Sequence, residues 1–457
     1  MLYVSTRGRA SASAFSDILL SGLAADGGLA MPDAWPTLTP KKLAAFRGAS
    51  YQDVAFTVLK AFAGGSFSDK ALKADIKAAY AGFDAPSIAP LTPLGNERYI
   101  LELFHGPTLA FKDIAMQVLA RLFGRALKKR GGRATILAAT SGDTGSAAIA
   151  AFGALPNIDL FVMHPKGRIS EVQRRQMTTA TDPNVHNIAL EGSFDDAQSI
   201  VKSLFADEAF ARGVSLTAVN SINFARIAAQ TVYYFTAAAQ LGAPPIFVVP
   251  TGNFGDVFAG EAATRMGLPV RGLVIATNAN DILVRALRDG VYEAGAAQHT
   301  SSPSMDIQAA SNFERALFEA SDRDAAWVAS AMKQKRLVIP PPVLAALRAR
   351  YSAQAVSDDE TLRAIARTHE RHGILVDPHT AVGLAAAENV LSDAPVVVLS
   401  TAHPAKFPDA VRKACGVGPV LPHRLAGLFE KKERVHVLKA DAAAVRGFVL
   451  DAIGRGA

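Results

Sequence analysis

Apolar and polar residues recur with helical spacing in the first part of the chain. Residues 51–64 and 68–83 each carry apolar side chains three and four positions apart behind a polar start. This spacing places the apolar side chains on one face of a helix. Residues 1–90 are therefore predicted to form a mainly helical N-terminal domain. The proline-containing passage at 85–95 predicts a linker or crossover.

The pattern changes after this passage, because short runs of β-branched and other apolar residues now alternate with helical stretches. Six such runs lie at 135–140, 159–165, 185–192, 245–252, 271–278 and 395–402. Alternation of this kind is typical of the α/β class, in which helices cover both faces of parallel sheets. We assign residues 91–457 to one α/β region, with a mainly helical insertion at about 290–375 before the last strand.

Composition narrows the class of protein. Half of the 457 residues are apolar and 19% are charged, which is typical of a globular protein rather than a disordered one. The formal net charge is +7, but Lys and Arg are spread along the chain, so we expect no nucleic-acid partner. No run approaches the roughly 18 apolar residues of a membrane span, so we expect no membrane partner either.

Cysteine and histidine usage argues against disulfides and metals. Cys415 is the only cysteine, and His369 and His372 lack the spacing of an HExxH site. We therefore expect no metal. A lone thiol fits a reducing compartment, and no signal-peptide pattern stands near the start, so we expect a cytoplasmic protein.

Two strand ends carry glycine-containing turns. Ligands of open α/β sheets gather beyond the carboxyl ends of strands, where loops lead into helices. The turn at 141–145 presents free N–H groups that suit an anion, although an ordinary helix cap is the alternative. The stretch at 251–260 has two glycines three positions apart, in the form of a phosphate cradle, and a tight turn is the alternative.

Further polar groups stand near the end of the last strand and at a helix start. Thr401 follows the last strand, where its hydroxyl could meet a ring nitrogen of a bound cofactor, whereas we expect His403 to cap or pack. Residues 219–230 crowd two amides, a hydroxyl and a guanidinium at the start of a helix. Such a group suits a phosphate or carboxylate, and a helix cap with a surface arginine is the alternative.

One lysine stands out for its neighbours. Lys112 lies between apolar Phe111 and acidic Asp113 in the segment HGPTLAFKDI. Burial disfavours an ammonium ion, so a buried lysine amine can attack a carbonyl and hold an aldehyde cofactor as a Schiff base. The alternative is a lysine at a helix start that extends over an apolar surface.

Taken together and in this order, the motifs resemble the threonine synthase family, in the longer form found in yeast and many bacteria. The motifs are YVSTRG at 3–8, GLAADGGLAMP at 22–32, HGPTLAFKD, ATSGDTG, NSINFARI, TGNFGD and STAHPAKFP. The resemblance covers nearly the whole chain. It implies a pyridoxal phosphate enzyme of fold type II, the tryptophan synthase β-like fold.

The resemblance also implies roles for residues of these motifs. Lys112 would carry pyridoxal 5'-phosphate as a Schiff base and act as the catalytic residue, and Thr401 would face the pyridine nitrogen. The loop for the cofactor phosphate would be Gly252, Asn253, Phe254, Gly255 and Asp256. The turn for the substrate carboxylate would be Ser141, Gly142, Asp143, Thr144 and Gly145. The candidates for the substrate phosphate are Asn220, Ser221, Asn223 and Arg226.

The reaction that the resemblance implies converts O-phospho-L-homoserine and water to L-threonine and phosphate. A phospho-lyase or dehydratase that releases a 2-oxo acid is one alternative, and a non-catalytic protein that binds a phosphate metabolite is another. Related enzymes of the fold often have Asn where this chain has Asp143. A carboxylate there would repel a substrate carboxylate unless it points away or is protonated, so its role stays open. The oligomeric state, monomer or homodimer, stays open as well.

Overall fold

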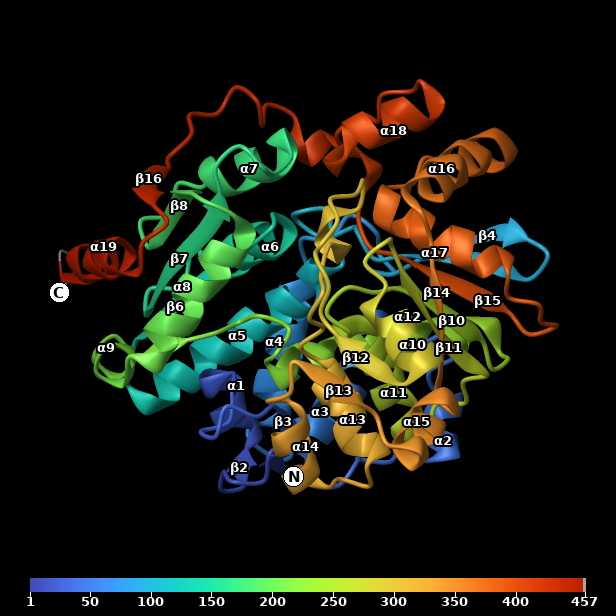
Figure 1. Cartoon of the computed structure of the whole chain (residues 1–457), viewed down its shortest axis with the longest axis horizontal. Helices are drawn as coiled ribbons and strands as arrows, with labels where there is room; N and C mark the ends of the chain where they lie inside the picture. Colours follow the sequence, from blue (N-terminus) through green and yellow to red (C-terminus); the bar gives the residue numbers. More distant parts are fainter. Residues whose placement is uncertain (455–457) are drawn as a thin grey trace.

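Two large β-sheets carry all six strands that the sequence predicts (Figure 1). The computed structural model describes residues 1–454. The five-stranded sheet is parallel and has the order β16-β8-β7-β6-β9. Its strands are β6 (Ala134–Ala139), β7 (Ile158–Pro165), β8 (Val185–Glu191), β9 (Leu216–Thr217) and β16 (His436–Lys439).

The six-stranded sheet has the order β14-β11-β10-β15-β5-β4 and is parallel except for β4. Its strands are β4 (Leu91–Gly95), β5 (Arg98–Glu102), β10 (Ile246–Pro250), β11 (Gly272–Thr277), β14 (Tyr351–Ala355) and β15 (Val396–Ser400). The central strands β10 and β15 are almost wholly buried, which explains their unbroken apolar runs. The predicted α/β class with parallel sheets is thus confirmed.

Two stretches differ from the prediction. The passage at 85–95 is not only a linker, because β4 pairs antiparallel with β5 at the edge of the sheet, where Pro93 is tolerated. Besides its helices, the stretch at 290–375 supplies β14 and a short hairpin of β12 (Val291–Glu293) and β13 (Arg336–Val338). As an edge strand with only its first residue buried, β14 lacks the apolar run of a central strand.

Helices surround both sheets. The N-terminal part holds α1 (Phe15–Ser21), α2 (Pro40–Ala44), α3 (Tyr51–Ala63) and α4 (Asp69–Tyr80), beside a three-stranded sheet of β1 (Leu2–Ser5), β2 (Ser13–Ala14) and β3 (Ala30–Pro32). Ser50 and Ser68 cap α3 and α4, as the polar starts predict. Helix α10 (Phe224–Leu241) is buried over most of its length and packs against α3, α5 and α11, which ties the N-terminal part to the α/β region.

The other helices follow the strands in chain order. They are α5 (Lys112–Arg130), α6 (Asp143–Phe152), α7 (Glu171–Thr178), α8 (Phe194–Ala206), α9 (Glu208–Gly213), α11 (Gly255–Arg265), α12 (Ile282–Asp289), α13 (Phe313–Ala320), α14 (Ala325–Ala331), α15 (Pro341–Arg348), α16 (Asp358–His372), α17 (Pro378–Glu388), α18 (Pro408–Cys415) and α19 (Ala442–Gly454). After α18 the chain crosses from the six-stranded to the five-stranded sheet, where it adds β16 and α19 (Figure 1). No helix within residues 1–454 is long and apolar enough to cross a membrane.

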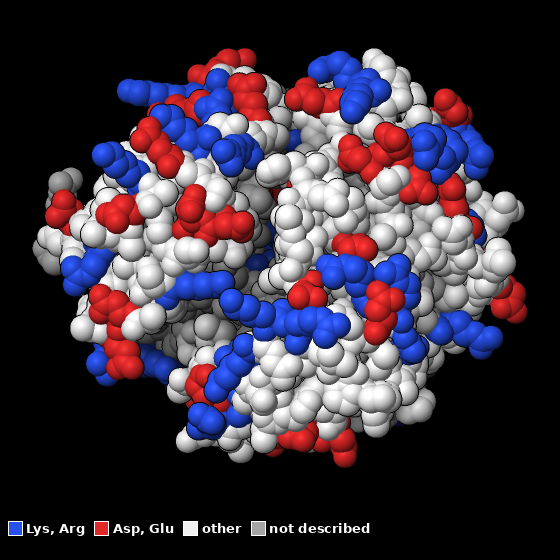
Figure 2. Space-filling model, viewed as in Figure 1, with Lys and Arg blue, Asp and Glu red and all other residues white. Residues whose placement is uncertain are grey.

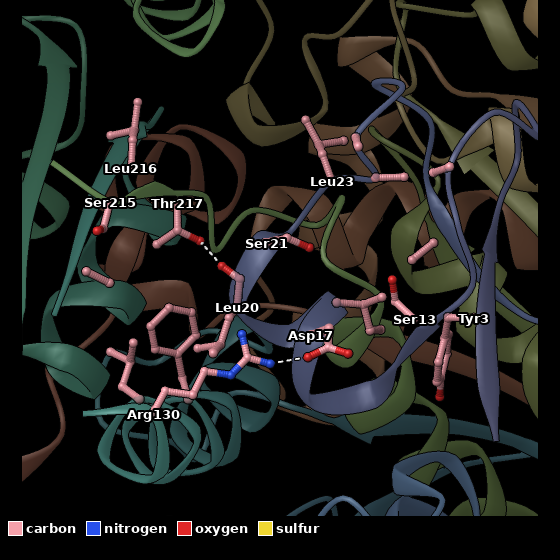
Figure 3. Close-up of a pocket in the computed structure, with 18 of the residues that line it drawn as sticks. Tyr3, Ser13, Asp17, Leu20, Ser21, Leu23, Arg130, Ser215, Leu216 and Thr217 are labelled. Atoms are coloured by element: carbon pink, nitrogen blue, oxygen red, sulfur yellow. Dashed lines mark hydrogen bonds and ion pairs between the residues drawn. The ribbon is translucent and has the colours of Figure 1, made fainter. Parts of the chain in front are cut away.

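A cavity of about 720 Å³ lies between the N-terminal strands and α1 on one side and α5 and β9 on the other (Figure 3). Two contacts join the two sides of this cavity. The Thr217 hydroxyl donates to the Leu20 carbonyl oxygen at 2.6 Å, and Arg130 pairs with Asp17. No lysine is among the described residues that line it. The chemistry predicted for Lys112 therefore belongs elsewhere.

Candidate active site

A second cavity, of about 670 Å³, collects most of the predicted site residues. It lies where the carboxyl ends of β6, β10 and β15 meet, and its lining comes from both sheets and the N-terminal part. Figure 2 shows a hollow between the two halves of the molecule, with Lys and Arg side chains beside it. The volume suits a small-molecule ligand.

Lys112 is the first residue of α5 and points its amine into this cavity. The side chain is 13% exposed, and Nζ lies 3.2 Å from Asp143 Oδ2. Burial lowers the pKa of Lys112, although the Asp143 carboxylate opposes this effect. The amine is therefore closer to its neutral, nucleophilic form than an ordinary lysine.

The segment before Lys112 runs beside the segment after β15. Phe111 N donates to the Thr401 carbonyl oxygen at 2.8 Å, and His403 N donates to the Leu109 carbonyl oxygen at 3.0 Å. These bonds bring two motifs together that are far apart in the sequence. They hold the start of α5 beside the end of the last strand.

Asp113 is not the acidic partner of Lys112. Its carboxylate is fully buried and accepts hydrogen bonds from the Thr108 N–H and hydroxyl, each at 2.7 Å. It therefore stabilises the loop that precedes the helix. The carboxylate that faces Lys112 belongs to Asp143, in a turn contributed by another strand.

The turn at 141–145 follows β6 and enters α6. Thr140 Oγ1 accepts from the N–H groups of Gly142 and Gly145, each at 2.9 Å. Neither glycine lines the cavity. Gly142 has φ of +131°, and a Cβ there would lie 2.5 Å from Gln173. The two glycines thus shape the turn.

The other members of this turn keep donors free for an anion. Ser141, Asp143 and Thr144 line the cavity. Within residues 1–454 the protein supplies no acceptor for their backbone N–H groups. Unsatisfied N–H groups at the start of α6 can bind a carboxylate.

Asp143 is the most strongly paired group of the site. Its Oδ1 accepts from Lys406 Nζ at 2.8 Å and from Gln173 Nε2 at 2.9 Å, while Oδ2 faces Lys112. The two lysines hold the pKa of Asp143 well below its usual value, against the opposing effect of burial. The Asp143 carboxylate is therefore ionised, and its two oxygens face Lys406 and Lys112. Because its charge is turned toward these lysines, Asp143 does not prevent an anion from binding at the N–H groups of the turn.

The loop after β10 leaves backbone N–H groups free to bind an anion. Phe254 adopts φ of +69° and precedes α11, while Gly255 N donates to Asn253 Oδ1 at 3.1 Å. Among the described residues, no protein acceptor contacts the N–H groups of Gly252, Asn253 and Asp256. A Cβ on Gly252 would lie 2.9 Å from the Ser304 carbonyl oxygen, so only glycine fits there. This is the backbone cradle that a phosphate requires.

Two side chains of this loop point away from an anion. Phe254 is fully buried and packs on Phe313 and Tyr351. Asp256 accepts at Oδ1 from the hydroxyls of Tyr233 and Tyr234, and burial raises its pKa to about 6. Only the backbone of these two loop residues is therefore suited to hold a phosphate.

The segment 219–230 separates into capping and ligand-facing residues. Asn223 does not line the cavity, because its Oδ1 caps α10 and its Nδ2 donates to the Leu19 carbonyl oxygen at 2.9 Å. Asn220, Ser221 and Arg226 do line it. The Asn223 amide is therefore already used by the fold.

Arg226 is a buried cation without a carboxylate partner. It is 2% exposed, its Nη1 approaches only the Val219 carbonyl oxygen at 3.5 Å, and its Nε has no partner within residues 1–454. Burial lowers its pKa to about 10. The Asn220 Oδ1 beside it is also buried without a partner. A buried cation left this way is suited to an anion from outside the protein.

The strand exit at Thr401 also reaches the cavity. Thr401 lines it, and the Thr401 hydroxyl makes no hydrogen bond to another described residue. His403 caps the short helix that follows it by accepting from Ala405 N, as predicted. His379 is held between the Asp377 carboxylate, 2.7 Å away, and the Ser304 N–H, 3.2 Å away, which supports a structural role.

Sequence reasoning missed several residues in or beside this cavity. Lys406, in the quoted motif STAHPAKFP, does not line the cavity but contacts Asp143, which does. Gln230 lines it and follows Arg226 by one helical turn, so helical spacing was the signal for Gln230. Arg7 lines the cavity from the N-terminal motif YVSTRG, with Nη2 2.8 Å from the Glu314 carboxylate. The signal for Lys406 was a lysine amid apolar neighbours at a strand exit. No group of metal-ligating residues occurs in the described part of the chain.

Comparisons with known proteins identify the family of this chain. The family model of the threonine synthase N terminus matches residues 2–80, that of pyridoxal-phosphate dependent enzymes matches 88–402, and that of the threonine synthase C-terminal part matches 380–449. A threonine synthase from Pseudomonas aeruginosa is 49% identical, over 100% of this chain and 99% of its own.

Solved structures agree as well. A PLP-bound threonine synthase from Brucella melitensis is 50% identical with a TM-score of 0.96, over 99% of both chains. The yeast threonine synthase is 35% identical with a TM-score of 0.93, again over 99% of both chains. Matches of this extent confirm the fold type II architecture. The chain belongs to the threonine synthase family of pyridoxal-phosphate dependent enzymes.

Proposed function

We propose that this chain converts O-phospho-L-homoserine and water to L-threonine and phosphate, with pyridoxal 5'-phosphate bound through Lys112. The observation that carries the proposal is the buried Lys112 amine in one cavity with two anion sites, the loop at 252–256 and the unpaired Arg226. A cofactor phosphate and a substrate phosphate need two such sites. The family membership supports the same reaction.

The residues present fit the cofactor. Lys112 supplies the aldehyde-reactive amine, the free N–H groups of 252–256 supply a phosphate cradle, and the Thr401 hydroxyl is free for a ring nitrogen. When bound, pyridoxal phosphate supplies an aldehyde carbon and an electron-accepting ring. We propose that the loop holds its phosphate through the free N–H groups of Gly252, Asn253 and Asp256, while the Gly255 N–H is bonded to Asn253 Oδ1 and Phe254 contributes only backbone.

Lys112 serves as the base in this proposal. Its Nζ removes the proton from Cα of the substrate and returns protons in the later steps, and lowered basicity suits a base that acts near neutral pH. The Asp143 carboxylate, 3.2 Å away, orients the amine and does not bind substrate.

The two ends of the substrate take separate sites. The N–H groups of Ser141, Asp143 and Thr144 bind its carboxylate, since the protein leaves them free. Arg226, with Asn220 and Ser221, binds the phosphate. Negative charge develops on the leaving phosphate, so a fixed, desolvated guanidinium stabilises the transition state more than the bound substrate.

We further propose a division into an N-terminal domain, 1–90, and a catalytic region, 91–457, whose last three residues lie outside the described part. The lack of regular structure between α4 and β4 supports this boundary. We also propose a cytoplasmic location, which the lone, half-buried thiol of Cys415 supports.

The test is product analysis with O-phospho-L-homoserine. We expect equal amounts of phosphate and threonine from the purified, cofactor-loaded chain and neither from Lys112→Ala. Phosphate with a 2-oxo acid would instead assign a phospho-lyase. Binding without any turnover would assign a non-catalytic protein.

A further inference from the structure

One carboxylate at this site is shared by two buried lysines. Lys406 is fully buried, and its Nζ lies 2.8 Å from Asp143 Oδ1, while the other oxygen, Oδ2, lies 3.2 Å from Lys112 Nζ. Gln173 Nε2 also donates to Oδ1, at 2.9 Å. The carboxylate thus lies between the two amines. The mechanism proposed above uses only one of them.

Lys406 is held by the same loop that leads to Lys112. Its Nζ donates to the Thr108 carbonyl oxygen at 2.7 Å, and Gln176 Nε2 donates to the same oxygen at 3.1 Å. Backbone bonds fix the segment of Lys406 to this loop, as described for Phe111 and Thr401. Lys406 Nζ is therefore held beside the carboxylate by contacts that do not involve Lys112.

The charges around Asp143 affect the protonation of Lys112. A buried carboxylate with Lys112 as its only partner would hold that lysine as an ammonium ion. With Lys406 present, the carboxylate is already neutralised, and Lys406 and Arg226 both disfavour a further positive charge at Lys112. The other titratable groups around these side chains are Asp256, His379 and Asp113, whose buried carboxyl group interacts with Lys406.

We propose that Lys406 is a positioning residue, a permanent second cation on the Asp143 carboxylate that leaves the Lys112 amine free to give up its proton and serve as the base. The inference rests on the proposed role of Lys112. The role proposed for Lys406 explains why Asp143 neither holds Lys112 as an ammonium ion nor repels an anion bound at the turn.

The test measures Lys112 itself rather than turnover. The full chain is freed of cofactor, shown to rebind it, and labelled with trace acetic anhydride across a pH series. Peptide mass spectrometry then gives the labelling midpoint of Lys112, with exposed Lys432 as internal reference. We expect Lys406→Met to raise the midpoint by about one pH unit or more, which is roughly tenfold slower labelling at a fixed pH below it.

Two variants should shift the Lys112 midpoint in opposite directions, which a merely structural role of Lys406 would not predict. Asp143→Asn should lower the midpoint, because two cations then face Lys112 without a carboxylate, and Lys406→Arg should leave it near that of the unaltered chain. If Lys406→Met does not fold, Asp143→Asn is compared with the double variant Asp143→Asn/Lys406→Met, in which the midpoint should rise again. An unchanged midpoint in either comparison would overturn the inference.

The labelling result and the proposed function fail in different ways. If the cofactor-loaded chain forms no threonine from O-phospho-L-homoserine, the proposed function is wrong, while the midpoints still report the charge relation. If Lys112→Ala retains threonine formation, the role of Lys112 as the base is wrong. If the midpoints do not move but Lys112→Ala is inactive, the role of Lys406 is wrong and the function stands. In cofactor-loaded Lys406→Met we expect a lower kcat with its acidic limb moved to higher pH, and little change in KM.

Discussion

The amine of Lys112 and the carboxylate of Asp143 lie 3.2 Å apart in the wall of the active-site cavity, both largely withdrawn from water. An ion pair buried to this degree is costly to break, since the partner left behind keeps its charge without solvent. Asp143 also pairs with Lys406, so removing the Asp143 carboxylate breaks two buried ion pairs.

Asp143→Asn should therefore destabilise the cofactor-free protein by about 3–5 kcal/mol, because it leaves two buried lysines unpaired. Urea unfolding of both proteins measures the difference. Asp409→Asn is the matched control, since Asp409 is 98% exposed and its pair with Arg412 is at the surface. A loss no larger than that of the control would contradict the buried-pair account.

The pH dependence of that difference has a defined sign. The folded-state pKa of Asp143 lies below its ordinary value of 3.8, so its contribution is complete above that value and is lost as pH falls through the lower, folded pKa. The stability gap between the unaltered chain and Asp143→Asn should not narrow from about pH 7 to about pH 5. A gap that closes steadily over this interval would mean that the carboxylate is not held ionised.

Asp256 should behave in the opposite sense. Burial raises its folded-state pKa to about 6, above the ordinary 3.8, so the folded state loses stability as pH rises between these values. Asp256→Asn keeps an acceptor for Tyr233 and Tyr234 and removes the charge. The variant should gain on the order of 2–3 kcal/mol relative to the unaltered chain between about pH 4 and pH 6 in urea titrations. If the free energy of unfolding of the two proteins changed in parallel with pH, the pKa of Asp256 would not be raised in the folded state.

Arg226→Gln should separate activity from stability. Loss of a guanidinium aimed at developing charge should lower kcat/KM for O-phospho-L-homoserine by about a hundredfold to a thousandfold. Unfolding stability should not fall, because no carboxylate loses its partner. Arg315→Gln is the contrast, since that fully buried guanidinium donates to the Ile222 carbonyl oxygen and should be needed for folding. Equal destabilisation by both changes would refute a ligand role for Arg226.

Gly142→Ala tests how the turn holds Asp143. The backbone there has φ of +131°, and the added Cβ would displace Gln173, which donates to Asp143. We expect a loss of about 1–3 kcal/mol and weaker substrate binding. Gly213→Ala, with open space around the added Cβ, should change stability by less than about 1 kcal/mol. Normal substrate affinity in Gly142→Ala would argue against a shaped turn.

Central strands could be predicted from the sequence more readily than edge strands. Strands such as β10 and β15 are buried between helices, so their apolar runs are continuous and easy to recognise, whereas β4 and β14 lie at edges and are not. Motif positions predicted which loops meet at the cavity, since loops at the carboxyl ends of parallel strands share one edge.

Side-chain pairing was harder to predict than loop position. Lys406 was missed because a lysine in a sequence is usually a solvated residue, and only the fold brings it to Asp143. Asn223 was assigned to the substrate because an amide at a helix start is equally suited to a ligand and to a cap, and here it caps α10. Arg226, by contrast, is buried rather than at the surface.

The most direct measurement is the identity of the lysine that holds the cofactor. Borohydride reduction of the pyridoxal phosphate-loaded chain, followed by peptide mass spectrometry, fixes the cofactor to its amine. The account predicts the added mass on Lys112 alone, with loss of threonine formation in parallel. Added mass on Lys406, its neighbour across Asp143, or on another lysine while Lys112 stays unmodified, would contradict it.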